Sequence, residues 1–145
     1  MKYSFLASTL LFFSLLSVAQ TKSTDVAGIW KTGGDDPAKI QIYKVGDKFY
    51  GKIIWLNKSI LNGKERTDTE NPDKMKRNQN IVGLQILNGF EFNGSDSWNN
   101  GTIYDPKTGK TYSCTITLKD SKTIKVRGYI GISLLGRTEM WSKEI

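Results

Sequence analysis

The chain has 145 residues, yet it contains no histidine and only one cysteine, Cys114. The absence of histidine excludes Ser-His-Asp and Cys-His catalysis and the usual zinc sites, and it removes the commonest general base near neutral pH. No Ser-x-x-Lys motif occurs, so lysine-activated serine chemistry lacks its signature. We therefore predict no enzyme, no catalytic residue, no cofactor and no metal site. The less favoured alternative is an enzyme that uses the carboxylates Asp68, Asp105 and Glu139.

One cysteine cannot form a disulfide within the chain, so a hydrophobic core must stabilise the fold. Residues 20–145 have the length of one domain, which is enough to bury such a core. Cys114 falls on the apolar face of a predicted strand, and we expect it to be buried. Pairing with a cysteine of another chain is the alternative.

Long apolar runs are missing except at the N-terminus, where residues 5–18 are apolar apart from Ser and Thr. Lys2 precedes this run, and Ser17-Val18-Ala19 fits the small-x-small cleavage rule. The run is shorter than the roughly 20 residues of a membrane span. We predict a signal peptide at residues 1–19, a periplasmic or secreted protein, and no transmembrane segment after cleavage. A retained N-terminal anchor is the alternative.

The chain has a formal net charge of +7, which favours anionic partners such as lipid head groups or carboxylated ligands. A simple solvated surface would explain scattered lysines equally well. The one local cluster, residues 74–77, is too short for a nucleic-acid tract, and no basic aromatic stripe accompanies it. We therefore predict no nucleic-acid partner.

The segment Gly101–Cys114 predicts a β-hairpin that turns at residues 105–109. After the turn, Ser and Thr alternate with apolar residues at a period of two. Gly109-Lys110-Thr111 lacks the remainder of a phosphate-binding loop and is interpreted as part of the turn. The predicted strands cover residues 28–31, 39–45, 48–56, 81–92, 98–104, 111–118, 123–131 and 134–143.

About eight short strands joined mostly by short turns indicate an all-β fold, a single antiparallel up-and-down barrel. The exception is a polar insertion at residues 57–80. Within it, Asn62-Gly63 predicts a turn and Asn71-Pro72-Asp73 predicts the start of one short helix, with Asn71 as its N-cap. The oxygen-rich run Asp68, Glu70, Asn71 and Asp73 is a weak calcium candidate without a known calcium-loop spacing.

Gly28-x-Trp30 and Gly136-Arg137 together resemble the lipocalin (calycin) signature. In that family a tryptophan of the first strand lies at the closed end of the barrel, and an arginine of the last strand packs across it. The resemblance therefore implies a cation–π contact between Trp30 and Arg137 that closes the barrel floor. The implied role of both residues is structural.

Further motifs follow one another along the chain: Tyr50-Gly51-Lys52-Ile53, Asp68-x-x-Asn71-Pro72-Asp73, Gly83-Leu84-x-Ile86-Leu87, Trp98-x-x-Gly101-x-Ile103-Tyr104-Asp105-Pro106-x-x-Gly109-Lys110, Val126-Arg127-Gly128-Tyr129 and Leu135-Gly136-Arg137-Thr138-x-x-Trp141. Over residues 28–141 the chain resembles the bacterial DUF2147 family of small exported proteins. The resemblance implies export and a lipocalin-like barrel. It implies no activity.

Strand parity indicates which side chains face a cavity. In the third strand Phe49, Gly51, Ile53 and Trp55 share the inner face, and in the last strand Arg137 shares a face with Glu139 as a neutralising partner. We expect aromatic side chains near the barrel mouth and arginines that match an anionic head group. The ligand-binding candidates are Tyr50, Trp55, Arg77, Trp98, Tyr104, Arg127 and Tyr129.

Two functions fit these features. The first is non-catalytic binding of a small apolar or amphipathic ligand in or at the mouth of the barrel. The alternative is an envelope interaction module that uses its surface and the 57–80 insertion to contact another protein or a cell-wall polymer. The sequence does not distinguish an open barrel interior from one filled by aromatic side chains.

Overall fold

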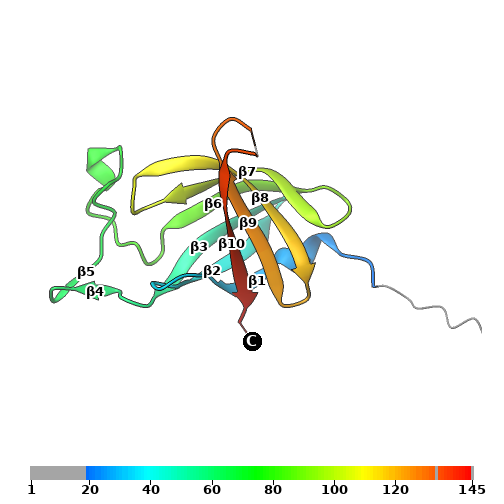
Figure 1. Ribbon diagram of the computed structural model, residues 1–145. Helices are drawn as coiled ribbons and strands as arrows, with labels where there is room; N and C mark the ends of the chain where they lie inside the picture. Colours follow the sequence, from blue (N-terminus) through cyan, green and yellow to red (C-terminus); the bar gives the residue numbers. More distant parts are fainter. Residues whose placement is uncertain (1–18, 133, 145) are drawn as a thin grey trace, which may run out of the picture.

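The computed structural model describes residues 19–132 and 134–144; the predicted signal peptide lies outside the described residues except for Ala19. These described residues form ten strands and two 3-10 helices, which Figure 1 labels where there is room. In chain order the elements are η1 (Ser23–Val26), β1 (Gly28–Lys31), β2 (Ala38–Val45), β3 (Lys48–Leu56), β4 (Ile60–Leu61), β5 (Lys64–Glu65), η2 (Lys74–Lys76), β6 (Gln85–Phe92), β7 (Ser97–Asp105), β8 (Lys110–Asp120), β9 (Thr123–Tyr129) and β10 (Gly136–Lys143).

Eight of these strands form one closed antiparallel barrel in the order β1-β10-β9-β8-β7-β6-β3-β2. Most strands that are neighbours in the barrel are also neighbours in sequence. The two exceptions are the seam between β1 and β10 and the pairing of β3 with β6, since β4 and β5 lie between these two in sequence. The predicted up-and-down barrel is therefore confirmed. We call the end with the β2–β3, β6–β7 and β8–β9 turns the floor, and the opposite end the mouth.

The floor half of the barrel is filled by apolar side chains. The largest fully buried ones are Trp30, Trp98, Phe49 and Phe90, and the predicted burial of Cys114 is confirmed. Burial raises the pKa of the Cys114 thiol to about 12. The strand predicted at residues 111–118 alternates as expected, with Cys114 and Ile116 inside the barrel.

Glycines make room for these large side chains. A Cβ at Gly101 would overlap Cγ and Cδ1 of the Phe90 ring and lie 2.5 Å from its Cδ2. Likewise a Cβ at Gly51 would lie 2.7 Å from Cδ1 of Leu87. These contacts cross the β6–β7 and β3–β6 pairs, so the missing side chains let the barrel wall close around the core.

The floor is closed by Trp30, whose indole Nε1 donates to the Val26 carbonyl of η1 at 2.8 Å. The predicted cation–π contact with Arg137 is wrong, because Lys143 takes that place with its ammonium 5.2 Å from the ring centroid. Trp30 pairs directly with Lys143 across the β1–β10 seam. Arg137 lies six residues before Lys143, near the start of β10 at the mouth, and 87% of its side chain is exposed.

The predicted inner position of Trp55 is also wrong. Ile53 pairs with Ile40 and Trp55 with Lys39, so β3 has one extra residue at this point. Such a bulge reverses the faces beyond it, which places Leu56 inside and leaves Trp55 39% exposed outside. The Lys39 ammonium lies 5.5 Å from the Trp55 ring centroid.

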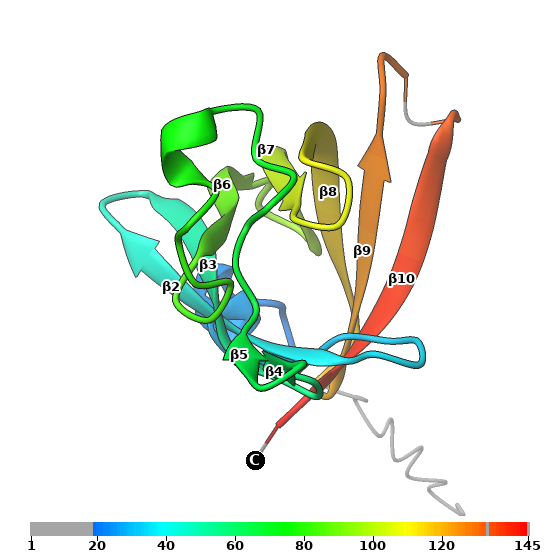
Figure 2. The same ribbon diagram turned by 90° about the vertical axis from the view of Figure 1, so that its left-hand side faces the viewer.

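The insertion between β3 and β6 contains a small β4–β5 hairpin and the single turn of η2. The hairpin turns at Asn62 and Gly63, both with positive φ, as the sequence predicted. The predicted helix exists only as η2, and its N-cap is Asp73, whose carboxylate accepts from the Met75 amide. Asn71 lies two residues earlier and serves a different purpose, described below. Seen from the mouth, the insertion crosses in front of the ring of strands (Figure 2).

Candidate functional site at the barrel mouth

A pocket of about 400 Å³ lies at the mouth, between the β1–β2 loop, the β7–β8 turn and β10. Its lining is mostly polar and charged, with acids and bases side by side. The residues that line it are Gly33, Gly34, Asp35, Asp36, Lys107, Arg137, Thr138, Glu139 and Met140. Three separate elements therefore meet around one hollow, which is the arrangement expected of a binding site.

The β10 wall of this pocket carries a chain of polar contacts. Arg137 and Glu139 are two residues apart on one face of the strand, and their side chains form an ion pair at 3.4 Å. The other carboxylate oxygen of Glu139 accepts from the Trp141 indole Nε1 at 3.2 Å. Trp141 is buried, so this chain joins the charged mouth to the apolar core. The predicted pairing of Arg137 with Glu139 is confirmed.

On the opposite wall, Asp36 has one satisfied and one unsatisfied oxygen. Its Oδ2 receives the Arg66 guanidinium at 3.1 Å. Its Oδ1 is enclosed and has no hydrogen-bond partner among the described residues. A buried acceptor without a donor costs about 1–3 kcal/mol, so a donor group that reached this atom would stabilise the complex. Gly34, at φ +85°, gives the adjoining loop its sharp turn.

A second polar cluster lies where the insertion meets β7. Asp68 is fully buried and accepts two hydrogen bonds, from the Tyr104 hydroxyl at 2.7 Å and from Asn71 Nδ2 at 2.6 Å. Asp68 and Tyr104 are 36 residues apart in the sequence. We call this contact the Asp68–Tyr104 latch, because it fastens the insertion to the barrel wall beside the mouth.

Arg77 belongs to the same cluster. Its Nε donates to the Asn71 carbonyl at 2.8 Å, and the Asn71 Oδ1 accepts from the Asp73 amide at 2.9 Å. Side-chain oxygens of Asp68, Asn71 and Asp73, three of the four residues of the calcium candidate, thus accept hydrogen bonds from protein donors. No group of three or more metal-ligating side chains occurs in residues 19–132 and 134–144.

The β7–β8 turn packs closely against the latch. A Cβ at Gly109 would overlap the Glu70 carbonyl oxygen, and Gly109 has a φ of +69°. Within the turn, Asp105 accepts from the Lys107 amide and the Thr108 hydroxyl. The Gly-Lys-Thr sequence is therefore a turn, as predicted. The same turn carries Lys107 into the mouth pocket, so latch and pocket share one structural support.

The latch should make stability sensitive to alkaline pH. Burial, reinforced by the hydrogen bond to Asp68, raises the pKa of Tyr104 from 10.0 to about 12. A pKa raised in the folded state means that this stabilisation is complete below about pH 10 and is lost as the pH rises toward 12. We expect the free energy of unfolding of the wild type to fall faster than that of Tyr104→Phe above pH 10, measured by urea denaturation. Parallel alkaline profiles for the two proteins would contradict this assignment.

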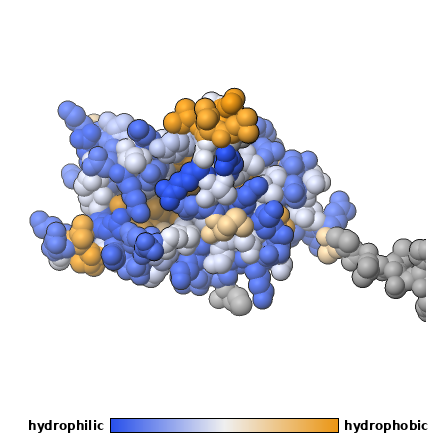
Figure 3. All heavy atoms as spheres, viewed as in Figure 1, coloured by the Kyte–Doolittle hydropathy of each residue, from blue (hydrophilic) through white to orange (hydrophobic). Residues whose placement is uncertain are grey.

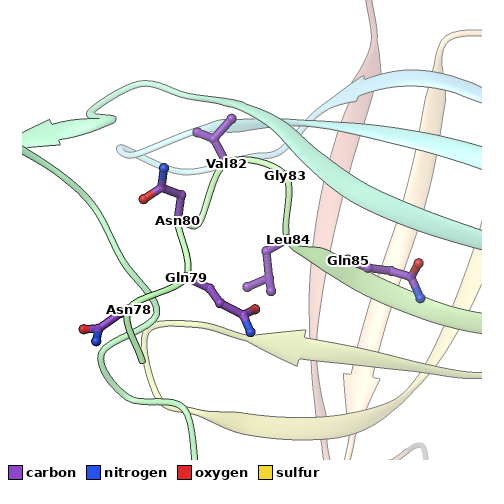
Figure 4. Close-up of a pocket in the computed structure, with 7 residues that line it drawn as sticks. All are labelled: Asn78, Gln79, Asn80, Val82, Gly83, Leu84 and Gln85. Carbon is purple, nitrogen blue, oxygen red and sulfur yellow. The ribbon is translucent and has the colours of Figure 1, made fainter. Parts of the chain in front are cut away.

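A second, larger hollow of about 630 Å³ follows the segment that leads from the insertion into β6. Figure 4 shows Asn80 and Val82 projecting to one side of this segment and Gln79 and Leu84 to the other. One continuous stretch of chain, residues 78–85 without Ile81, forms its whole lining. It therefore lacks the convergent groups from several elements that distinguish the mouth pocket.

Two predicted ligand-binding residues lie at the floor instead of the mouth. Trp98 is fully buried in the core, and its Nε1 donates to the Ser23 carbonyl of η1 at 3.0 Å. Tyr50 lies close to the β2–β3 turn, where it stacks on Tyr43 with 6.2 Å between ring centroids. Parity could not reveal this, because it gives the face of a residue but not its height in the barrel.

Arg127 and Tyr129 lie on the outer face of β9, as the sequence predicted. Arg127 donates to Thr138 Oγ1 at 2.7 Å and to the Leu134 carbonyl at 3.3 Å. None of the seven ligand-binding candidates is among the residues that line the mouth pocket; Tyr104 and Arg77 belong to the cluster around Asp68 and Asn71. Lys107 and Asp36 were not predicted, because they come from turns and carry no periodic signal.

A closed eight-stranded antiparallel barrel with a 3-10 helix and a tryptophan at its floor places this protein in the lipocalin-like class of folds. Residues 28–143 match the model of the family described as "Uncharacterized protein conserved in bacteria (DUF2147)". The chain therefore belongs to the DUF2147 family. A search of the curated proteins gives no match.

Among solved structures, the chain is similar to protein HP1028 from the human pathogen Helicobacter pylori, which is described as belonging to the lipocalin family. The TM-score is 0.75, the sequence identity is 21%, and the match covers 83% of each chain. At this identity the similarity establishes the fold alone. It agrees with the lipocalin-like barrel predicted from the sequence.

Proposed function

We propose that this protein binds a small amphipathic ligand at the mouth of its barrel without catalysing a reaction. The observation that carries the proposal is the pocket of about 400 Å³ in which Lys107, Arg137 and Glu139 converge from two elements. Its volume lies within the range of about 300–1,000 Å³ that small-molecule sites have. Such a fold is compatible with ligand binding. The charged lining of the pocket favours a ligand with a charged head group.

The cations of the pocket favour a polar head group that carries an anion. Arg137 and Lys107 are exposed cations at its rim, and a guanidinium fork matches a carboxylate or phosphate. An apolar tail would lie against Met140, which is 47% exposed. The tail cannot reach the floor, because aromatic side chains already fill it.

An exported protein is part of this proposal. It is supported by the signal-peptide pattern of residues 1–19. Residues 19–132 and 134–144 include no helix long and apolar enough to cross a bilayer. Fractionation of the source cells, with detection of Gln20 as the mature N-terminus, would test the location.

The pocket leads to a prediction about affinity. We expect dodecanoate, a simple anionic amphiphile, to bind the wild type and to bind Arg137→Gln about tenfold more weakly, since a hydrogen bond to a charged group contributes about 1.5–3 kcal/mol. Isothermal titration calorimetry measures both affinities, and native mass spectrometry of freshly purified protein detects any ligand already bound. Trp141, two residues from Glu139, provides a fluorescence signal for the same titration.

Lys122→Gln is the matched control, because it removes one positive charge from the β8–β9 turn at the floor. Its affinity for dodecanoate should equal that of the wild type. Equal affinities for wild type and Arg137→Gln would refute the pocket as the site. No binding of dodecanoate or of the neutral detergent dodecyl maltoside, together with no co-purified ligand, would refute the function.

A second candidate function is an interaction module, and one observation favours it. The insertion exposes Ile60, Leu61 and Met75, the last of them 92% exposed. A protein partner or a cell-wall polymer would cover these side chains. A pull-down in which a specific partner is lost after deletion of residues 58–66 would favour this function over ligand binding.

A further inference from the structure

The loop between β9 and β10 carries an apolar tip at the mouth end of the barrel. Ile130, Ile132, Leu134 and Leu135 form this tip, and they are 67%, 59%, 83% and 69% exposed. Figure 3 shows them as one hydrophobic patch that projects from the top of the molecule, above strongly hydrophilic atoms. Single exposed aliphatic side chains are ordinary, but four within one short loop need a reason.

Hydrogen bonds hold the described residues of this loop, 130–132 and 134–135. The Leu135 amide donates to the Ile132 carbonyl at 3.1 Å, and Gly131 has a φ of +76°, so the chain turns tightly. At its base, the Arg127 guanidinium ties β9 to Thr138 of β10 and to the Leu134 carbonyl. Solvent-facing turns usually carry Gly, Asn, Asp and Ser. Here the turn holds aliphatic side chains outward.

The two strands that lead to the tip carry basic side chains next to it. From Lys125 to Thr138 the sequence contains Lys125, Arg127 and Arg137 and no aspartate or glutamate. The next residue of β10 is Glu139, which pairs with Arg137. Tyr129, whose ring is amphipathic, lies on the outer face at the base of the tip. Down the hairpin, the aliphatic tip comes first, then the tyrosine, then the cations. This order matches a bilayer from its hydrocarbon tails, through the interface favoured by tyrosine, to the anionic head groups.

From this pattern we infer that the β9–β10 tip inserts into the interface of an anionic lipid membrane and docks the barrel with its mouth toward the surface. The tip is convex and small, whereas a stable protein interface buries about 800 Å² on each partner with close shape complementarity. Shallow insertion into lipid requires no matching shape, only apolar area and opposite charge. The four aliphatic residues of the tip are not among those that line the mouth pocket, and the inference does not depend on the proposed function.

Vesicle flotation tests the inference with residues 20–145, which contain every strand and every core residue described above. We expect this protein to float with vesicles of phosphatidylcholine and phosphatidylglycerol at 7:3, and to float poorly with phosphatidylcholine alone. Replacement of three tip residues in Ile132→Ser/Leu134→Ser/Leu135→Ser should lower the partition coefficient at least tenfold. Ile60→Ser/Leu61→Ser is the matched control, since these two are 55% and 59% exposed on the β4–β5 hairpin and should not change binding.

Two further measurements separate insertion from adhesion. Raising the salt to 0.5 M should reduce flotation several-fold, because salt screens the attraction between surface charges and anionic lipid. A Leu134→Cys variant labelled with an environment-sensitive dye should show a blue-shifted emission on anionic vesicles. Labelling is selective because Cys114 is fully buried and its thiol pKa is raised to about 12.

Several results would overturn the inference. One is the absence of wild-type flotation on anionic vesicles, and another is equal flotation of the wild type and the tip variant. Equal losses of flotation in the tip variant and in Ile60→Ser/Leu61→Ser would mean that any exposed apolar side chain contributes to non-specific adsorption. A wild-type dimer that becomes monomeric in the tip variant, measured by light scattering, would instead assign the tip to contact between two copies of this chain.

Discussion

The Gly101→Ala variant is expected to lose about 3 kcal/mol of folding free energy, the upper part of the range for an overpacked core. The added methyl group would overlap the ring of Phe90, which is only 1% exposed and packed in the core. Urea denaturation followed by tryptophan fluorescence measures the change. The midpoint should fall at an unchanged slope, because the surface exposed on unfolding stays the same.

Gly128→Ala is the control for this prediction. Gly128 also faces inward, but a Cβ there would lie 3.4 Å from the Ile103 side chain, in ordinary contact. We expect a change within about 0.5 kcal/mol. In addition, Phe90→Leu should relieve much of the overlap, so the two substitutions in one chain should cost less than their sum. A Gly101→Ala protein as stable as the wild type would show that the ring is free to shift.

The Asp68→Ala variant is expected to lose about 3 kcal/mol as well, because the buried carboxylate accepts two hydrogen bonds and each to a charged group contributes about 1.5–3 kcal/mol. Removing it leaves Tyr104 and Asn71 without their acceptor. The same denaturation experiment at pH 7 measures the loss. Asp68→Asn retains an acceptor for Tyr104 and should lose about half as much.

A double-mutant cycle isolates the latch. Tyr104→Phe alone removes one donor, and the pair Asp68→Ala/Tyr104→Phe should be less destabilised than the sum, by about 1–2 kcal/mol. Additive effects would mean that the two side chains act independently. A loss below about 0.5 kcal/mol for Asp68→Ala would contradict a stabilising role for the cluster.

The strands could be predicted from sequence because each is a local pattern. Alternation along β8 correctly predicted that Cys114 and Ile116 face the inside of the barrel. Asn62-Gly63 correctly predicted the turn of the β4–β5 hairpin. The face of Trp55 failed because a bulge next to Ile53 depends on the pairing of β2 with β3. The short helix was predicted at Asn71, but that residue hydrogen-bonds Asp68 and leaves Asp73 to cap η2.

The site was harder to predict because contacts between distant segments define it. Parity correctly paired Arg137 with Glu139, since both are on one strand. Parity could not predict the register of β10 against β1. In that register Lys143 lies beside Trp30, and Arg137 lies at the mouth. Nor did any local signal connect Asp68 with Tyr104, or bring Lys107 and Asp36 to one pocket.

The seam between the first and last strands has a consequence for how fast the protein folds. It brings together groups 118 residues apart, such as the Lys143 ammonium and the Asp25 carbonyl. Loop-closure entropy must be overcome before so distant a pairing contributes, so a barrel of this topology has a high contact order and folds slowly. During synthesis the ring cannot close until the final strand has emerged, and until then the edges of β1 and β9 remain available to chaperones or to other chains.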